Sequence, residues 1–241
     1  MAIELREQGV RATGTAVPHE TATTEHAFLA SVYAWMAAGL ALTAVVALFT
    51  VSTPALLQLV LGNRMVFFAL MIGQLGLVIG VTSAINRLSP ATATGLFLLY
   101  AGLNGVTLSV ILLAYTGASV AGTFFVSAGM FGTMSLYGAV TKRDLAAWGS
   151  FLFMGLIGVV IASLVNLFLR NDGLSWVMAM VGVVVFTGLA AYDTNKLRAL
   201  ARQGFADEST ERKGAIIGAL ALYLDFINLF LMMLRLFGRR R

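Results

Sequence analysis

The sequence of 241 residues contains no cysteine. A disulfide framework, a thiolate nucleophile, a zinc–thiolate site and an iron–sulfur cluster all need cysteine and are therefore excluded. Histidine is also scarce: His19 and His26 lie in or beside a polar N-terminal stretch, and neither belongs to a His-Glu-x-x-His zinc motif. The Gly-x-Ser-x-Gly elbow of serine hydrolases is missing as well. These absences argue against the common enzyme classes and predict no resident cofactor.

Charged residues make up only 11% of the chain, against about 25% in an average soluble domain. Hydrophobic residues make up 59%, and the mean hydropathy is +0.88. Apolar stretches long enough to cross a bilayer occupy residues 27–51, 65–86, 91–115, 119–140, 146–169, 174–195 and 215–238. The sequence therefore predicts an all-α membrane protein with seven transmembrane helices. Its transmembrane domain would cover residues 27–241, after a polar tail at residues 1–26.

Lysine and arginine are distributed unequally between the two sides of the predicted spans. With a cytoplasmic N-terminus, ten of the sixteen basic residues face the cytoplasm, the side that such residues favour. These ten are Arg6, Arg11, Arg87, Lys142, Arg143, Lys196, Arg198, Arg202, Arg212 and Lys213. Their positions between apolar runs predict contact with lipid headgroups and argue against a nucleic-acid partner. Because Arg239, Arg240 and Arg241 would lie outside, a re-entrant last segment with both termini inside is kept as an alternative.

Small and neutral polar residues inside the spans are expected to mediate helix packing, because small side chains let helices approach closely in lipid. The small residues considered are Gly76, Gly80, Ala128, Gly132, Gly155 and Gly158. Amides deep in a span are expected to hydrogen-bond a neighbouring helix. These are Gln74, Asn104 and Asn166.

Asp193 and Asp225 are the two acidic residues, of eleven in the chain, that fall inside the apolar runs. An ionised side chain at the bilayer centre costs at least about 2.5 to 3.5 kcal/mol, so it normally faces the bundle interior or water and has a partner. Antiparallel packing of the last two spans would bring the two aspartates together. Two carboxyl groups in contact do not both ionise cheaply, so the pair is expected to share one proton. This arrangement predicts a proton-operated switch.

The last apolar run has one narrow stripe of small and polar residues, at the spacing of one helix face. The stripe consists of Gly214, Gly218, Ala221, Asp225 and Asn228. A helix of this kind is expected to lie centrally, with Asp225 pointing at a neighbour or a water-filled crevice. Asp225 lies about 18 Å along the helix from Lys213, whereas Asp193 is about 5 Å from Lys196. Either the charged segment between the spans continues as helix beyond the bilayer, or water reaches inward.

Two segments of the sequence resemble the signature of the Bax inhibitor-1 family, in its bacterial branch. One is Ala191-Tyr-Asp-Thr-Asn-Lys196, and the other is Ala219-Leu-Ala-Leu-Tyr-Leu-Asp-Phe-Ile-Asn-Leu-Phe230 with Leu234-Arg-Leu-Phe-Gly238. The similarity extends over the chain from Ala27 onward. It implies a seven-helix fold whose last helix is surrounded by the other six, in a bacterial inner membrane.

The resemblance also implies a pH-sensitive calcium leak, with Ca²⁺ and protons as the ions handled and no bound cofactor. Its sensor would be the pair Asp193 and Asp225, which would also contact Ca²⁺ transiently. Arg87 matches, more loosely, an arginine that latches the pair. Tyr192, Tyr223 and Asn228 are the polar neighbours expected to support the pair or, on a purely structural interpretation, simply to hydrogen-bond the two acids.

Two other functions stay open at the level of sequence. A regulatory membrane protein would bind a membrane protease or a cell-death partner, with its N-terminal tail as a natural contact. An intramembrane aspartyl protease would use Asp193 and Asp225 to activate water. However, Leu222-Tyr-Leu-Asp225 stands where such proteases have a glycine-rich turn, and no Pro-Ala-Leu element follows. We therefore expect no enzymatic activity.

Overall fold

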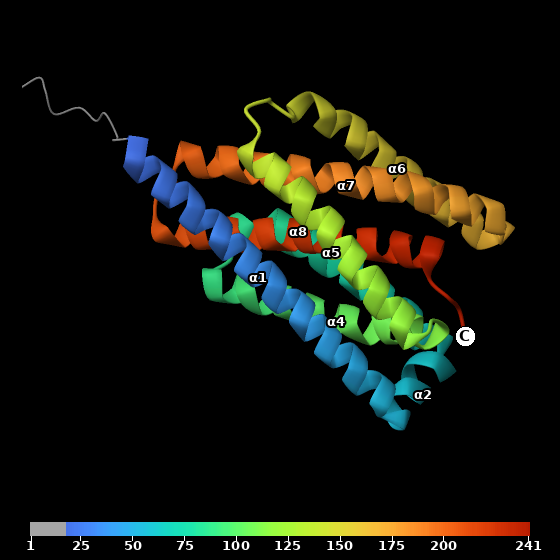
Figure 1. The fold of residues 1–241 in the computed structure, drawn as a ribbon. Helices are drawn as coiled ribbons and strands as arrows, with labels where there is room; N and C mark the ends of the chain where they lie inside the picture. Colours follow the sequence, from blue (N-terminus) through green and yellow to red (C-terminus); the bar gives the residue numbers. More distant parts are fainter. Residues whose placement is uncertain (1–17) are drawn as a thin grey trace, which may run out of the picture.

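The computed structural model describes residues 18–241, with side chains from Thr23 onward. This part of the chain folds into α-helices joined by short connections (Figure 1). The helices are α1 (Pro18–Ser52), α2 (Pro54–Gly62), α3 (Arg64–Ala84), the short 3₁₀ helix η1 (Ile85–Arg87), α4 (Pro90–Ala114), α5 (Gly117–Val140), α6 (Ala146–Leu169), α7 (Asp172–Gln203) and α8 (Glu208–Phe237).

All seven predicted spans are confirmed as helices long and apolar enough to cross a membrane. The first connection differs from the prediction, because it holds α2, a helix of nine residues that is too short to span. The predicted tail also differs at its end. Residues 1–17 lie outside the described part of the chain, but residues 18–26 belong to α1. Glu25 in this segment is buried by its ion pairs with α7. The polar sequence around Glu25 gives no sign of that burial.

Helix α8 is the most buried of the seven spans, because 67% of its apolar central stretch lies inside the bundle. Its more extensive contacts are with α1, α4, α5 and α7, whereas α3 lies mainly against α4 and α6 mainly against α7. Figure 1 shows α8 running between α7 and α4, with α6 outermost beside α7. Enclosure of α8 by all six other spans stays a prediction.

The charged segment between the last two spans is largely helical. Helix α7 continues to Gln203 and α8 begins at Glu208, so only residues 204–207 form the connection. Gly204 occupies a positive-φ position (φ 77°) at the end of α7. The side chain of Asp207 accepts a hydrogen bond from the Thr210 amide (2.7 Å), which begins α8 and lowers the pKa of that carboxyl. Of the two alternatives for the depth of the aspartates, helical extension is therefore present.

Helix α8 also runs the full length of the bundle. Its end continues into residues that pair with the α4–α5 connection, where the Thr116 amide donates to the Arg239 carbonyl (3.0 Å) and the Arg241 amide to the Ala114 carbonyl (3.0 Å). Because that connection lies at the end opposite the α7–α8 connection, α8 is a spanning helix. The re-entrant alternative is wrong.

The three deep amides behave as predicted and join neighbouring helices. Gln74 donates to the Leu103 carbonyl (3.2 Å), Asn104 to the Tyr223 hydroxyl (2.9 Å) and Asn166 to the Ser175 hydroxyl (2.6 Å).

The small residues divide into two groups. A Cβ on Gly155 would lie 2.8 Å from Val185, as expected for close helix packing. At Gly76, Gly80, Gly132 and Gly158 a Cβ would meet nothing within 4 Å. The packing prediction is therefore wrong for these four positions within the described chain, because their helix faces point outward.

Candidate functional site

Asp193 and Asp225 meet across the interface of α7 and α8. Their carboxyl groups lie in hydrogen-bond contact with each other. Asp225 is only 6% exposed, and its Oδ2 finds no donor among the described residues. Because ionised carboxylates only accept hydrogen bonds, a single proton held between the two groups converts this contact into a hydrogen bond. The arrangement is therefore chemically suited to holding a proton.

A crevice of about 380 Å³ lies between α7 and α8 and reaches Asp193. It is lined on α7 by Asp193, Lys196, Leu197, Ala199, Leu200 and Gln203, and on α8 by Gly214, Ile217, Gly218 and Ala221. The small residues of the predicted α8 stripe thus face α7 and leave the space open. Asp193 lies at its inner part, and Asp225 follows Ala221 by about one helical turn. An ion entering this crevice reaches Asp193 before Asp225.

The α7–α8 interface is tightly packed on the other side of Asp225. A Cβ on Gly182 of α7 would lie 2.8 Å from Cγ and 3.0 Å from Sδ of Met232 on α8, so the two helices are in close contact there. Phe226 and Phe230 extend this packing towards α5, since both rings contact Phe124 edge-on. Beyond Asp225 the α7–α8 interface is therefore closed by apolar packing.

Comparison with known families gives this geometry a context. The family model described as "Inhibitor of apoptosis-promoting Bax1" matches residues 25–241, which includes all seven spans and both aspartates. The chain belongs to this Bax inhibitor family. The resemblance seen in the two signature segments is thereby confirmed.

Individual bacterial proteins match the chain over most of their length. The inner membrane protein YbhL of Escherichia coli K12 is 53% identical over 215 residues, covering 89% of this chain and 92% of YbhL. An uncharacterized protein of Deinococcus radiodurans is 49% identical over 213 residues, 88% of this chain and 90% of that protein. One from Borreliella burgdorferi is 45% identical over 214 residues, with 89% and 92% covered.

Arg87, the latch suggested by the family resemblance, is not brought to the aspartates in this structure. It ends η1, between α3 and α4, and its side chain is exposed. Within residues 18–241 no hydrogen bond or ion pair joins it to Asp193 or Asp225. The cation that interacts electrostatically with Asp193 is instead Lys196, at the next turn of α7. A latch by Arg87 stays a prediction for a different conformation.

The three expected supporting residues make other contacts, and no hydrogen bond joins them to the carboxyl pair among the described residues. Tyr192 turns towards α6, where its ring lies against Gly149. Asn228 donates to the Leu224 carbonyl of its own helix (2.8 Å). Tyr223 is fully buried on another face of α8, where its hydroxyl contacts the Thr43 hydroxyl at 2.6 Å and accepts from Asn104. Tyr223 therefore joins α8 to α1 and α4.

Tyr223→Phe is expected to lower stability without changing the titration of the aspartates. The substitution leaves the Asn104 amide without its acceptor, which costs about 1 to 2 kcal/mol for a buried hydrogen bond between membrane helices. A lower thermal midpoint in detergent, with an unchanged titration of the aspartates, is the expected result. Tyr137→Phe is a matched control, because Tyr137 is 42% exposed and loss of its hydroxyl should leave both properties intact.

A second ionic cluster, not predicted from the sequence, lies near the same end of the bundle. Glu25 of α1 accepts from Arg198 and from Arg202 (2.8 Å), and Arg198 also donates to the Thr141 carbonyl at the end of α5 (3.0 Å). The cluster ties α1, α5 and α7 together. Arg198 and Arg202 at i, i+4 on one helix face are the sequence signal for a shared acidic partner, but Glu25 is far away in sequence.

The described residues contain no cluster of three or more acidic or histidine side chains that could hold a metal ion. The Asp193–Asp225 pair supplies two carboxylates, fewer than the six to eight oxygen ligands that Ca²⁺ usually takes. Any calcium ion at the pair would therefore keep several of its water ligands.

Proposed function

We propose that this protein is a pH-sensitive cation leak of the bacterial inner membrane that prefers Ca²⁺. The observation that carries the proposal is the contact of two carboxyl groups, on α7 and α8, at the inner part of a crevice. Membership of the Bax inhibitor family and the similarity to the inner membrane protein YbhL support it. Carboxylate oxygens suit a hard cation such as Ca²⁺.

We propose that the proton shared by Asp193 and Asp225 controls the leak. With one proton shared, the carboxyl groups hold α7 and α8 together and the pair carries less negative charge. When the proton leaves, two carboxylates repel each other across the interface and attract a cation. Separation of the helices would relieve the close contact between Gly182 and Met232 and extend the crevice towards the other end. The structure described here, with its contact intact, corresponds to the closed state of this scheme.

The decisive experiment measures Ca²⁺ flux into proteoliposomes at stepped pH, with wild type and with Asp193→Asn and Asp225→Asn. The expected result is a flux that depends on pH in wild type and much less in either variant. Flux that responds to pH equally in all three proteins would contradict the proposed switch, and the absence of any flux from wild type would contradict the leak.

A paired-aspartate site is also the arrangement that an aspartyl protease needs. The two functions are separated by offering a membrane-embedded peptide to the same proteoliposomes. Intact peptide after long incubation is the result expected for a leak. Cleavage that Asp225→Ala abolishes would instead favour the protease.

The proposal places the crevice mouth in the cytoplasm, together with the N-terminus. Because the chain has no cysteine, Ser209→Cys near the mouth and Ala118→Cys at the opposite end each create a single reporter, and both positions are exposed. A membrane-impermeant maleimide applied to intact spheroplasts should label the Ala118→Cys protein at once and the Ser209→Cys protein only after permeabilisation. The reverse pattern would show the opposite orientation.

A further inference from the structure

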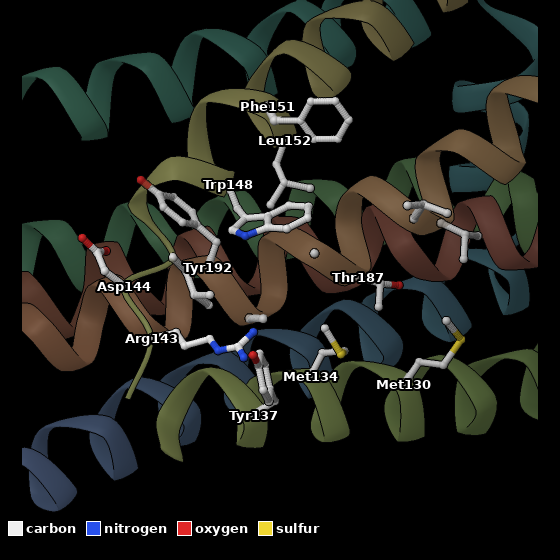
Figure 2. A pocket seen from close by; sticks show the side chains of 15 residues that line it. Met130, Met134, Tyr137, Arg143, Asp144, Trp148, Phe151, Leu152, Thr187 and Tyr192 are labelled. Carbon is white, nitrogen blue, oxygen red and sulfur yellow. The ribbon is translucent and has the colours of Figure 1, made fainter. Parts of the chain in front are cut away.

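A second cavity lies between α5, α6 and α7, on the side of α7 away from the carboxyl pair. Its volume is about 530 Å³, and its lining is mostly apolar. Figure 2 shows Met130 and Met134 of α5 across the cavity from Leu152, Phe151 and Trp148 of α6. Three side chains of the lining, Trp148, Phe151 and Val184, are 59%, 62% and 70% exposed, so the cavity opens at the surface of the bundle. We call it the apolar groove.

One end of the apolar groove is basic. Arg143 and Asp144 line both the groove and an adjoining cavity of about 520 Å³, the basic cavity. The charged residues around the basic cavity are Lys142, Arg143, Asp144, Arg198 and Arg202. Arg198 and Arg202 share Glu25, whereas the three ion pairs found in residues 23–241 include neither Lys142 nor Arg143. The basic cavity therefore has an excess of positive charge, with two exposed cations available to a ligand.

The dimensions of the groove match one lipid leaflet. Along α7 it extends from Val183 to Tyr192, which at 1.5 Å per residue is about 14 Å. Half of the hydrocarbon thickness of a bilayer is about 15 Å. Trp148 and Tyr137 line the groove towards its basic end, and such residues favour the headgroup level of a membrane. The basic cavity is thereby placed where lipid phosphates lie.

We propose that α5, α6 and α7 form a binding site for one anionic phospholipid. The phosphate would occupy the basic cavity beside Lys142 and Arg143, and one acyl chain would lie in the apolar groove. A guanidinium and an ammonium recognise a phosphodiester by charge-assisted hydrogen bonds, and basic pockets between transmembrane helices suit acidic headgroups. A lipid is favoured over a protein segment because the groove opens on the lipid-facing side of the bundle and has the length of a single chain.

Native mass spectrometry of the purified protein, with phosphatidylglycerol or phosphatidylcholine added to the detergent, tests the site. Wild type should retain phosphatidylglycerol in preference to phosphatidylcholine. The double variant Lys142→Gln, Arg143→Gln should bind phosphatidylglycerol roughly 30-fold more weakly, because each basic residue contributes about fivefold near a membrane surface. The matched control is Arg64→Gln, Arg170→Gln, which removes two exposed charges at the opposite end of the bundle and should bind like wild type.

The apolar part of the site is tested separately with Val184→Trp, which fills the groove without changing charge. Phosphatidylglycerol retention should fall at least several-fold, while the thermal midpoint stays near that of wild type because Val184 is 70% exposed. Equal retention of the two lipids by wild type would overturn the proposal. An equal loss of binding in the Arg64→Gln, Arg170→Gln control would also overturn it. A wild-type dimer that holds no lipid and that Val184→Trp dissociates would overturn it as well.

Discussion

Replacing Asp225 with asparagine is expected to make calcium flux nearly insensitive to pH between about 6 and 8. In wild type, loss of one shared proton across this window should raise flux roughly tenfold, because two ionised carboxylates repel each other and attract the cation. Asparagine has the shape of the protonated acid but does not titrate, so the variant should change by less than about twofold. Asp193→Asn should act in the same direction, since either substitution removes the carboxyl–carboxyl contact.

The control for this experiment must remove a carboxylate without touching the pair. Asp172→Asn meets that need, because Asp172 is exposed in the first turn of α7, at the end of that helix far from Asp193. Its pH profile should match wild type. A flux that still rises with pH in the double variant Asp193→Asn, Asp225→Asn would show that another group carries the proton. Fluorescent calcium indicators inside proteoliposomes, with internal pH clamped, give the profile directly.

Gly105→Val is expected to have the largest effect on stability. Helix α4 meets α1 closely at this glycine, where an added Cβ would lie 2.6 Å from the Thr43 carbonyl oxygen and 2.9 Å from the Val46 Cβ. Because part of the obstacle is backbone, the helices must separate, and overpacking of this kind costs about 3 kcal/mol or more. For a domain of this size that corresponds to a fall in the thermal midpoint of roughly 6 to 12 °C.

Gly102 provides the matched comparison on the same helix. A Cβ there would meet nothing within 4 Å, so Gly102→Val carries the same change in helix propensity without the collision. Thermal unfolding in detergent, followed by the monodisperse peak in size-exclusion chromatography, should separate the two variants clearly. Equal midpoints for Gly105→Val and Gly102→Val would mean that the close approach of α1 and α4 does not limit stability.

The helices themselves could be predicted because transmembrane spans follow from local hydropathy. All seven apolar runs are helices, and the wrong predictions concern features that hydropathy does not determine. Helix α2 is too short to be recognised as a span. The sequence predicts too late a start for α1 because Glu25 looks like part of a polar tail, although the distant Arg198 and Arg202 bury it. Gly76 and Gly80 look like packing residues, yet their side of α3 has no neighbour among the described residues.

The supporting residues of the site show a different limit. Tyr223 is two residues from Asp225. Side chains two positions apart on a helix point in nearly opposite directions, so helix geometry alone keeps Tyr223 away from the carboxyl pair. What cannot be seen in the sequence is its partners: the side chains of Thr43 and Asn104 come from two other helices. The role of Arg87 is implied by family resemblance alone, and no hydrogen bond or ion pair within residues 18–241 joins it to the aspartates.

The sequence by itself determined that this is a seven-span membrane protein and that two acids lie inside its spans. Each of those properties is set one segment at a time, by the cost of placing a side chain in hydrocarbon. Only the tertiary structure decided that the acids touch, that a crevice reaches Asp193 and that an apolar groove ends among basic residues. Such meetings depend on how each helix is rotated and offset against its neighbours, and a shift of one residue turns a side chain by about 100°.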